Sequence, residues 1–462
     1  MGGYYKSVKM ERVMEEIKFY DLNPSQEVSK LQCKYTLFKR VINILSSMST
    51  TDKIDFDLMK TALNKVIERN DCLRIRFVKK DRKLMQYFAA HQDLDFVPVL
   101  TFTTREEQEA FIAQIGKKAI KYMDGIVIEP YFINTYDGKS MIFLKVCHMV
   151  LDMYGISVIY KDLFEVYDAL KNGTELPEAP ASFEEIVKKD LVQKANEESK
   201  EKQKEFFTEY LSKKEEPYYV GLPAEKDPIW AKRKAKGKRA QKMFFIQNDT
   251  KGYALDMGKE LTAKIMAHCQ ENKVSPANFL LYTMSVCAAK VNGNVKGMLP
   301  LELCNCRGSL AERKCSGTKV QSLGCYVECD HDKSFNENLA EYIANRNVVF
   351  RRISFPDQEF EVLMHKIYKS SVFSTYYSIT YSFIPYELDE KLDFQIYSNG
   401  KCALPAYIGH LYNAKTGDMV MIYDVQTKII QESDVNSFHE KYLKTIEQVL
   451  ENPEIIIKDI KL

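Results

Sequence analysis

A strand, turn and helix in the first half of the sequence constrain this chain more than any other segment. Residues 141–145 form a short apolar run typical of a buried strand, and the apolar residues of 156–167 recur at helical spacing. His148 and Asp152 lie between them, four residues apart. Because a turn at a strand end can hold a side chain over a cavity on a rigid scaffold, the segment predicts an imidazole at a functional site.

The pair His148 and Asp152 has two interpretations. A general base must be neutral near pH 7 and keep one orientation, and an aspartate four residues on can fix the turn or another charge without touching a substrate. The alternative is a buried histidine that hydrogen-bonds to backbone and does no chemistry. The HxxxD pattern is too short to decide between them.

Composition excludes several classes of protein. With 462 residues, 45% hydrophobic and 28% charged, the chain is long enough for two or three domains and typical of a globular protein. A net charge of +2 gives no general attraction to nucleic acid or membranes. The most apolar helical segment, 277–289, is too short to span a bilayer. The 11 cysteines and the lack of a signal peptide favour reduced thiols, and we expect a cytoplasmic protein with no membrane span.

Strand patterns and helix patterns alternate along the whole sequence, which indicates an α/β fold. The linker-like segment 171–180 divides the chain, and the halves share one order of elements, so we expect two related lobes, 1–175 and 176–462. The main predicted helices are 57–69, 105–118, one long charged helix over 182–212, 261–272, 276–291, 335–352 and 435–450. The main predicted strands are 35–45, 73–77, 84–88, 297–305, one that begins at 324, 375–384 and 419–424.

Two other groupings could carry chemistry. Six thiol and imidazole side chains crowd into one region: Cys304, Cys306, Cys315, Cys325, Cys329 and His331. Zinc is one interpretation, but the spacings lack the paired short motifs of structural zinc, and buried thiols that behave as small apolar residues are the other; we expect no metal. Cys147 precedes His148, but neighbouring strand residues point to opposite faces, which makes a thiol nucleophile activated by this histidine awkward.

A basic stretch, 232–239, allows two interpretations as well. It is either a solvated loop or a patch for phosphates or an acidic partner. Arg307 follows the strand 297–305. It is of structural interest only if its side chain contacts Asp152.

Several ordered motifs resemble the condensation-domain branch of the CoA-dependent acyltransferase superfamily, over nearly the whole chain. Residues 68–77, ERNDCLRIRF, are similar to the family's RHExLRTxF segment, and 147–152 resembles its HHxxxDG motif. Residues 182–211 resemble the helix that follows the first lobe, and 303–307 the strand that ends in a structural arginine. Residues 324–327 are similar to the family's IGxFVN segment.

The resemblance implies two chloramphenicol-acetyltransferase-like lobes that form a V-shaped pseudo-dimer, with the active site in a tunnel between them. His148 corresponds to the catalytic histidine, Asp152 to a structural aspartate and Arg307 to its ion-pair partner. The family transfers an acyl group from a phosphopantetheine thioester, on a carrier protein or on CoA, to an amine or alcohol, with no permanently bound cofactor. It is the family of nonribosomal peptide synthetase condensation domains.

The sequence departs from the family motif at three positions. Cys147 replaces its first histidine, Met153 its glycine and Gly155 a serine or threonine, so Cys147, Met153 and Gly155 are expected beside the tunnel. The backbone N–H near Gly155, or Ser382 on a later strand, is a candidate donor to the oxyanion.

Three functions remain open from the sequence. The first is condensation, with His148 accepting or positioning a proton. The second is a non-catalytic module of the same fold that recruits carrier proteins, for which Met153 is the reason. The third is O-acylation of an alcohol from CoA. No adenylation or carrier segment is recognisable, so we expect action in trans. Donor, acceptor and oligomeric state are not specified.

Overall fold

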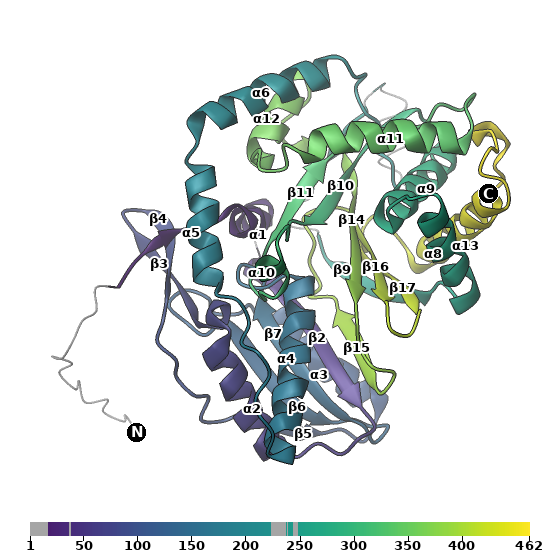
Figure 1. Ribbon diagram of the computed structural model, residues 1–462. Helices are drawn as coiled ribbons and strands as arrows, with labels where there is room; N and C mark the ends of the chain where they lie inside the picture. The colour runs from purple at the N-terminus through teal and green to yellow at the C-terminus, as the bar shows by residue number, and fades with distance from the viewer. Residues whose placement is uncertain (1–16, 37, 223–236, 238, 244–247) are drawn as a thin grey trace.

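The computed structural model describes residues 17–36, 38–222, 237, 239–243 and 248–462. Most of the basic stretch 232–239 and the start of the chain lie outside these residues. Two separate sheets with helices on their faces dominate the molecule (Figure 1), which confirms the α/β class. A three-stranded sheet, β1 (Tyr20–Asp21), β4 (Lys83–Phe88) and β3 (Ile75–Lys80), lies beside the first of them.

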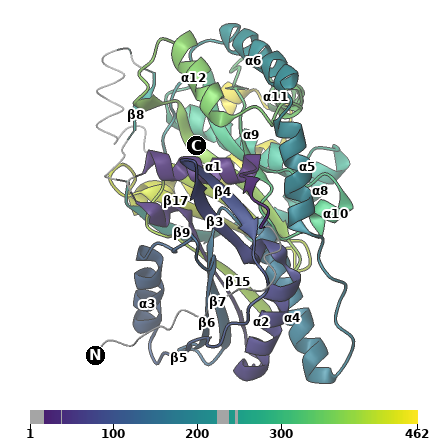
Figure 2. The same ribbon diagram turned by 90° about the vertical axis from the view of Figure 1, so that its left-hand side faces the viewer.

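The first large sheet has five strands in the order β15, β2, β7, β6, β5. Their bounds are Leu392–Tyr397, Asn43–Thr50, Ser140–Cys147, Ile128–Asn134 and Val99–Thr101. Every residue of β2 and β7 is buried, because helices cover both faces. In Figure 2, α2 (Phe56–Arg69) and α4 (Met153–Asn172) lie on one side of the sheet and α3 (Arg105–Lys117) on the other.

The second large sheet has seven strands: six follow the order β11, β10, β14, β16, β17, β9, and the seventh, β12 (Val327–Glu328), pairs with β10. Their bounds are Val320–Gly324, Gly297–Asn305, Tyr377–Tyr386, Ala406–Asn413, Met419–Gln426 and Thr250–Asp256. The covering helices are α8 (Lys259–Glu271), α9 (Pro276–Val291), α11 (Phe335–Phe350) and α13 (Glu432–Glu451). Residues 278–289 of α9 are all buried, which explains why this helix is apolar all round.

The second half of the chain contributes a strand to the sheet of the first lobe. β15 comes from the second half of the chain, yet it pairs antiparallel with β2 along six residue pairs, from Leu392 opposite Thr50 to Tyr397 opposite Leu45. The segment that follows it is tied to the first lobe too, because Asn399 Nδ2 donates to the carbonyl oxygens of Val41 and Asn43. The predicted boundary between residues 175 and 176 falls between α4 and α5 (Phe183–Lys194) and stays a prediction.

Three predicted elements are wrong in detail. The long helix over 182–212 is two helices, α5 and α6 (Glu197–Ser212), because the Asn196 side chain accepts from the Ser199 N–H and starts a second helix. Of the strand predicted over 35–45, Tyr35 is the last residue of a helix, 39–42 form a 3-10 turn, η1 (Lys39–Ile42), and β2 begins only at Asn43. Gly324 ends β11 and does not begin a strand.

No helix among the described residues is long and apolar enough to cross a bilayer. The apolar segment noted in the sequence, 277–289, is instead the buried centre of α9.

Candidate active site

The histidine turn is built by backbone hydrogen bonds from both sides. β7 ends at Cys147, and the His148 N–H donates to the Ile42 carbonyl oxygen at 2.8 Å, just before β2. The Val150 N–H donates back to the Cys147 carbonyl at 2.9 Å, which closes the turn. α4 then begins at Met153, with Asp152 as its N-cap. His148 therefore lies on the strand-to-helix turn that the sequence predicts.

The imidazole of His148 is half-buried and lines a cavity between the two large sheets. Its Nδ1 lies 3.4 Å from the hydroxyl of Ser29, on α1 (Pro24–Tyr35), and the same hydroxyl donates to the His148 carbonyl oxygen at 3.2 Å. Burial lowers the pKa of His148, against smaller opposing effects of a hydrogen bond to its own backbone and of the Asp152 charge. The ring is therefore neutral near pH 7, as a proton acceptor has to be.

Asp152 holds the turn and does not hydrogen-bond to the imidazole of His148. Its carboxylate accepts from the Gly155 N–H at 2.8 Å and from the Lys319 N–H at 2.7 Å. It also takes two parallel hydrogen bonds from Arg307, at 3.0 and 3.1 Å. The two side chains are only 6% and 1% exposed, so this is a buried ion pair between the lobes.

Arg307 uses its remaining donors on the loop that follows β10. Its guanidinium donates to Asn305 Oδ1 at 2.9 Å and to the Gly317 carbonyl at 2.5 Å, and it lies 4.6 Å from the ring centre of Tyr154. One arginine therefore joins the start of α4 to the loop of 305–319.

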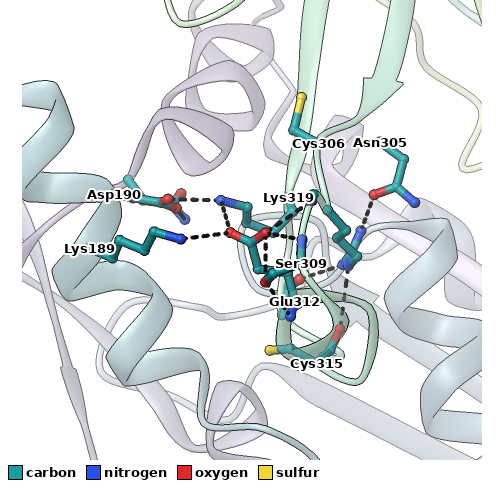
Figure 3. A network of polar contacts seen from close by, with 12 residues as sticks. Lys189, Asp190, Asn305, Cys306, Ser309, Glu312, Cys315 and Lys319 are labelled. Carbon is teal, nitrogen blue, oxygen red and sulfur yellow. Dashed lines mark hydrogen bonds and ion pairs between the residues drawn. The ribbon is translucent and has the colours of Figure 1, made fainter.

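A second polar network fixes the same loop to α5 (Figure 3). Lys319 is almost fully buried, and its ammonium lies 2.8 Å from Asp190 and 3.5 Å from Glu312. Glu312 also closes a capping box with Ser309 around the short helix α10 (Leu310–Arg313). These contacts lie within the second lobe and hold the loop that carries Arg307, whereas the pair of Arg307 with Asp152 crosses to the first lobe at the histidine turn.

A cavity of about 700 Å³ lies where the two large sheets meet. It is lined by β2 and α3 from the first lobe and by β9, β10, β14 and β17 from the second. Five of the site residues expected from the sequence line this one cavity: His148, Asp152, Met153, Arg307 and Ser382.

The other two expected site residues are not among the lining residues. Cys147 is fully buried, and burial raises its pKa to about 12, so its thiol is not a nucleophile. The N–H of Gly155 already donates to Asp152, so this N–H is not free to donate to an oxyanion, and a place for Gly155 beside the tunnel stays a prediction. A Cβ at Gly155 would lie 1.8 Å from the Ser316 carbonyl oxygen, so glycine is needed here for the close approach of the 315–318 loop.

The cysteine-rich region holds thiols that pack as apolar groups. Burial raises the pKa of Cys306, Cys315, Cys325 and Cys329 to about 12, and Cys304 shifts in the same direction. Among the described residues, no group of three or more His, Cys, Asp or Glu side chains is arranged to hold a metal ion.

Several residues in or beside the cavity were not found from the sequence. Ser29, which contacts His148 but does not line the cavity, comes from a helix about 120 residues earlier, and the lining residues Tyr407 and Asp424 come from β16 and β17. The only local signal for Tyr407 and Asp424 is the strand alternation that puts them on the same face as Ser382, and that signal does not say which face lines the cavity.

Comparison with known proteins agrees with this geometry. The family model described as Condensation domain matches residues 16–462. Surfactin synthase subunit 1 of Bacillus subtilis (strain 168) is 22% identical over 466 residues, which cover 97% of this chain. The chain spans only 12% of the length of that protein.

Two solved structures share the fold. A variant of the starter condensation domain of rhizomide synthetase RzmA, in complex with C8-CoA and Leu-SNAC, superposes with a TM-score of 0.77 at 15% identity, covering 96% of this chain and 97% of that one. The first condensation domain of the calcium-dependent antibiotic synthetase, bound to a substrate analogue, gives 0.78 at 13% identity, covering 96% and 100%. The predicted fold of two chloramphenicol-acetyltransferase-like lobes is confirmed. This protein belongs to the condensation-domain family.

Proposed function

We propose that the protein transfers an acyl group from a phosphopantetheine thioester to an amine or alcohol, with His148 as the proton acceptor. The observation that carries this proposal is a neutral imidazole, held by backbone at a rigid turn, that faces a 700 Å³ cavity between two lobes. A cavity of this size accommodates the reacting ends of two extended substrates.

The reaction needs no covalent enzyme intermediate. The acceptor nitrogen or oxygen attacks the thioester carbonyl carbon, and its proton passes to His148. Collapse of the tetrahedral intermediate breaks the carbon–sulfur bond, and the leaving thiolate takes the proton from His148, which restores the neutral imidazole. Ser382 lines the cavity and offers a hydroxyl to the oxyanion, whereas the Gly155 N–H is occupied.

The donor is proposed as a thioester on phosphopantetheine because the rhizomide synthetase domain of the same fold is bound to C8-CoA. Carrier protein and CoA share this arm, so octanoyl-CoA and an octanoyl carrier protein are both to be tested as donors.

The test compares wild type with His148→Ala in a product assay by mass spectrometry, with an octanoyl thioester and a panel of primary amines and alcohols. The variant should lose about 10²–10⁴-fold in rate, the usual contribution of a positioned proton acceptor. His268→Ala is the matched control, since His268 lies on α8 and does not line the cavity. Full activity of His148→Ala would contradict the proposal.

A second candidate function is binding without turnover, and Met153 favours it. The side chain of Met153 lines the cavity one residue after Asp152, where the family motif has glycine. Measurable binding of an acylated carrier protein, together with no product from any amine or alcohol of the panel, would support this alternative.

A further inference from the structure

One carboxyl group on the cavity wall has no cation beside it among the residues that the structure describes. Asp424 lies on β17, between β16 and β9, and lines the cavity that His148 faces. Its neighbour across β16 is Tyr407, and its neighbour across β9 is Gly252. Because Gly252 has no side chain, Ser398 can approach this position closely: a Cβ at Gly252 would lie 3.2 Å from the Ser398 Cβ.

Two hydroxyl groups hold Asp424 in place. Ser398 Oγ donates to Asp424 Oδ1 at 2.8 Å, and the hydroxyls of Thr250 and Ser398 lie 3.1 Å apart. In the part of the chain that the structure describes, no Lys, Arg or His forms an ion pair with Asp424.

Three other charged groups on the cavity wall have partners of their own, and the acidic residues Glu109, Asp357 and Glu361 line the cavity as well. Asp152 and Arg307 neutralise each other. The ammonium of Lys401 lies 2.9 Å from Asp249 and 3.9 Å from the ring centre of Phe38. Asp424 is therefore a carboxyl group on the cavity wall whose neighbours, among the described residues, are hydroxyl donors and no cation.

The titratable groups that face Asp424 are neutral near pH 7. Burial raises the pKa of Tyr407 on β16 to about 12, and that of Cys402, in the loop after β15, to about 12. β9 contributes only the hydroxyl of Thr250. Burial also raises the pKa of Asp424, against the hydrogen bonds from Thr250 and Ser398.

We propose that Asp424 is a specificity-determining residue, which receives a primary ammonium group on the part of the substrate that lies against β16 and β17. This inference rests on the proposed function, because the cavity is taken to hold the substrates. An ammonium group would supply the missing counter-ion and a charge-assisted hydrogen bond, whereas a hydroxyl would supply only a neutral one. Preference for an amine over the matching alcohol should be about tenfold or more.

The test measures equilibrium binding and does not need turnover. Hexylammonium and 1-hexanol are the probes, and their dissociation constants are measured by calorimetry for wild type, Asp424→Asn and Asp418→Asn. Asp418 is a control aspartate near the start of β17, 43% exposed at its side chain and paired with Lys259. Wild type and Asp418→Asn should prefer the amine about tenfold or more, and Asp424→Asn should bind both probes about equally.

Two results would overturn the proposal. One is equal binding of the two probes by wild type. The other is an amine preference that survives Asp424→Asn and disappears in Asp357→Asn, because Asp357 and Glu361 line the same cavity from α12 (Asp357–Ile367).

A measurement on unaltered Asp424 covers the case in which Asp424→Asn does not fold. The amine preference of wild type should rise with pH as Asp424 ionises, while the hexanol affinity stays constant. Because His148 titrates in the same cavity and burial raises the pKa of Asp357 there to about 8, the series is repeated with His148→Gln and with Asp357→Asn, which should each show the same rise. A flat preference in all three proteins would contradict the proposal. An amine preference with no product would refute the proposed function and leave this inference standing.

Discussion

The ion pair between Asp152 and Arg307 allows a quantitative prediction. Each partner is almost completely buried, and Asp152 accepts two hydrogen bonds from Arg307 and two from backbone N–H groups. Asp152→Ala leaves a buried guanidinium without its counter-ion and removes the N-cap of α4. Arg307→Ala leaves a buried carboxylate. Each change should lower the free energy of unfolding by about 3–5 kcal/mol.

The double variant discriminates between a coupled pair and two separate effects. With both partners gone, no charge is left buried alone, so the double variant should cost at least about 2 kcal/mol less than the sum of the single costs. Urea unfolding followed by helical circular dichroism measures all three variants. The exposed pair of Lys314 and Glu178, whose charged atoms are 2.7 Å apart, is the control and should show no measurable coupling. If the double variant loses as much free energy of unfolding as the two single variants together, the idea that this pair couples the lobes is refuted.

Three further predictions follow from other contacts. Gly155→Ala should destabilise the protein by more than the usual 1–3 kcal/mol of an overpacked site, since its Cβ would lie 1.8 Å from the Ser316 oxygen; an unchanged urea midpoint would contradict this. The acid limb of the pH–rate profile should lie below pH 6.5, because burial lowers the pKa of His148 and only the neutral ring accepts a proton; a limb above that value would point to another group. Burial lowers the pKa of His410 from 6.5 to about 3, so the unfolded chain binds one proton more between these values. Above pH 6.5, protonation of His410 in the unfolded chain therefore costs the folded protein no stability. Below pH 6.5 this one group lowers the free energy of unfolding by up to about 1.4 kcal/mol per pH unit, down to about pH 3. Unfolding midpoints of His410→Gln should show a shallower acid dependence.

Local patterns predicted the parts of the fold that depend on neighbouring residues. The helix of 276–291 and the strand of 297–305 begin and end where periodicity placed them, because Pro276 starts the helix and the apolar run is uninterrupted. The histidine turn was predicted for the same reason. The break at Asn196 was missed because the charge pattern continues through it, and only the capping side chain marks the new helix.

Contacts between distant segments could not be predicted from local patterns. That Arg307 meets Asp152 was implied only by the resemblance, since 155 residues separate them. Pairing of β15 with β2 and the position of Asp424 on the cavity wall depend on how the two lobes meet. Strand alternation gives two faces, and tertiary packing decides which of them faces the cavity.

The pairing of β2 with β15 also has a consequence for folding during synthesis of the chain. The edge of β2 stays without its neighbour until the ribosome has synthesised residues 392–397, long after the rest of the five-stranded sheet has emerged. During that interval the nascent chain presents a row of unpaired backbone N–H and C=O groups. The side chains beside them are ones that the folded protein buries. A fragment that ends before β15 should therefore aggregate, and supplying the β15 segment as a separate peptide should suppress that aggregation.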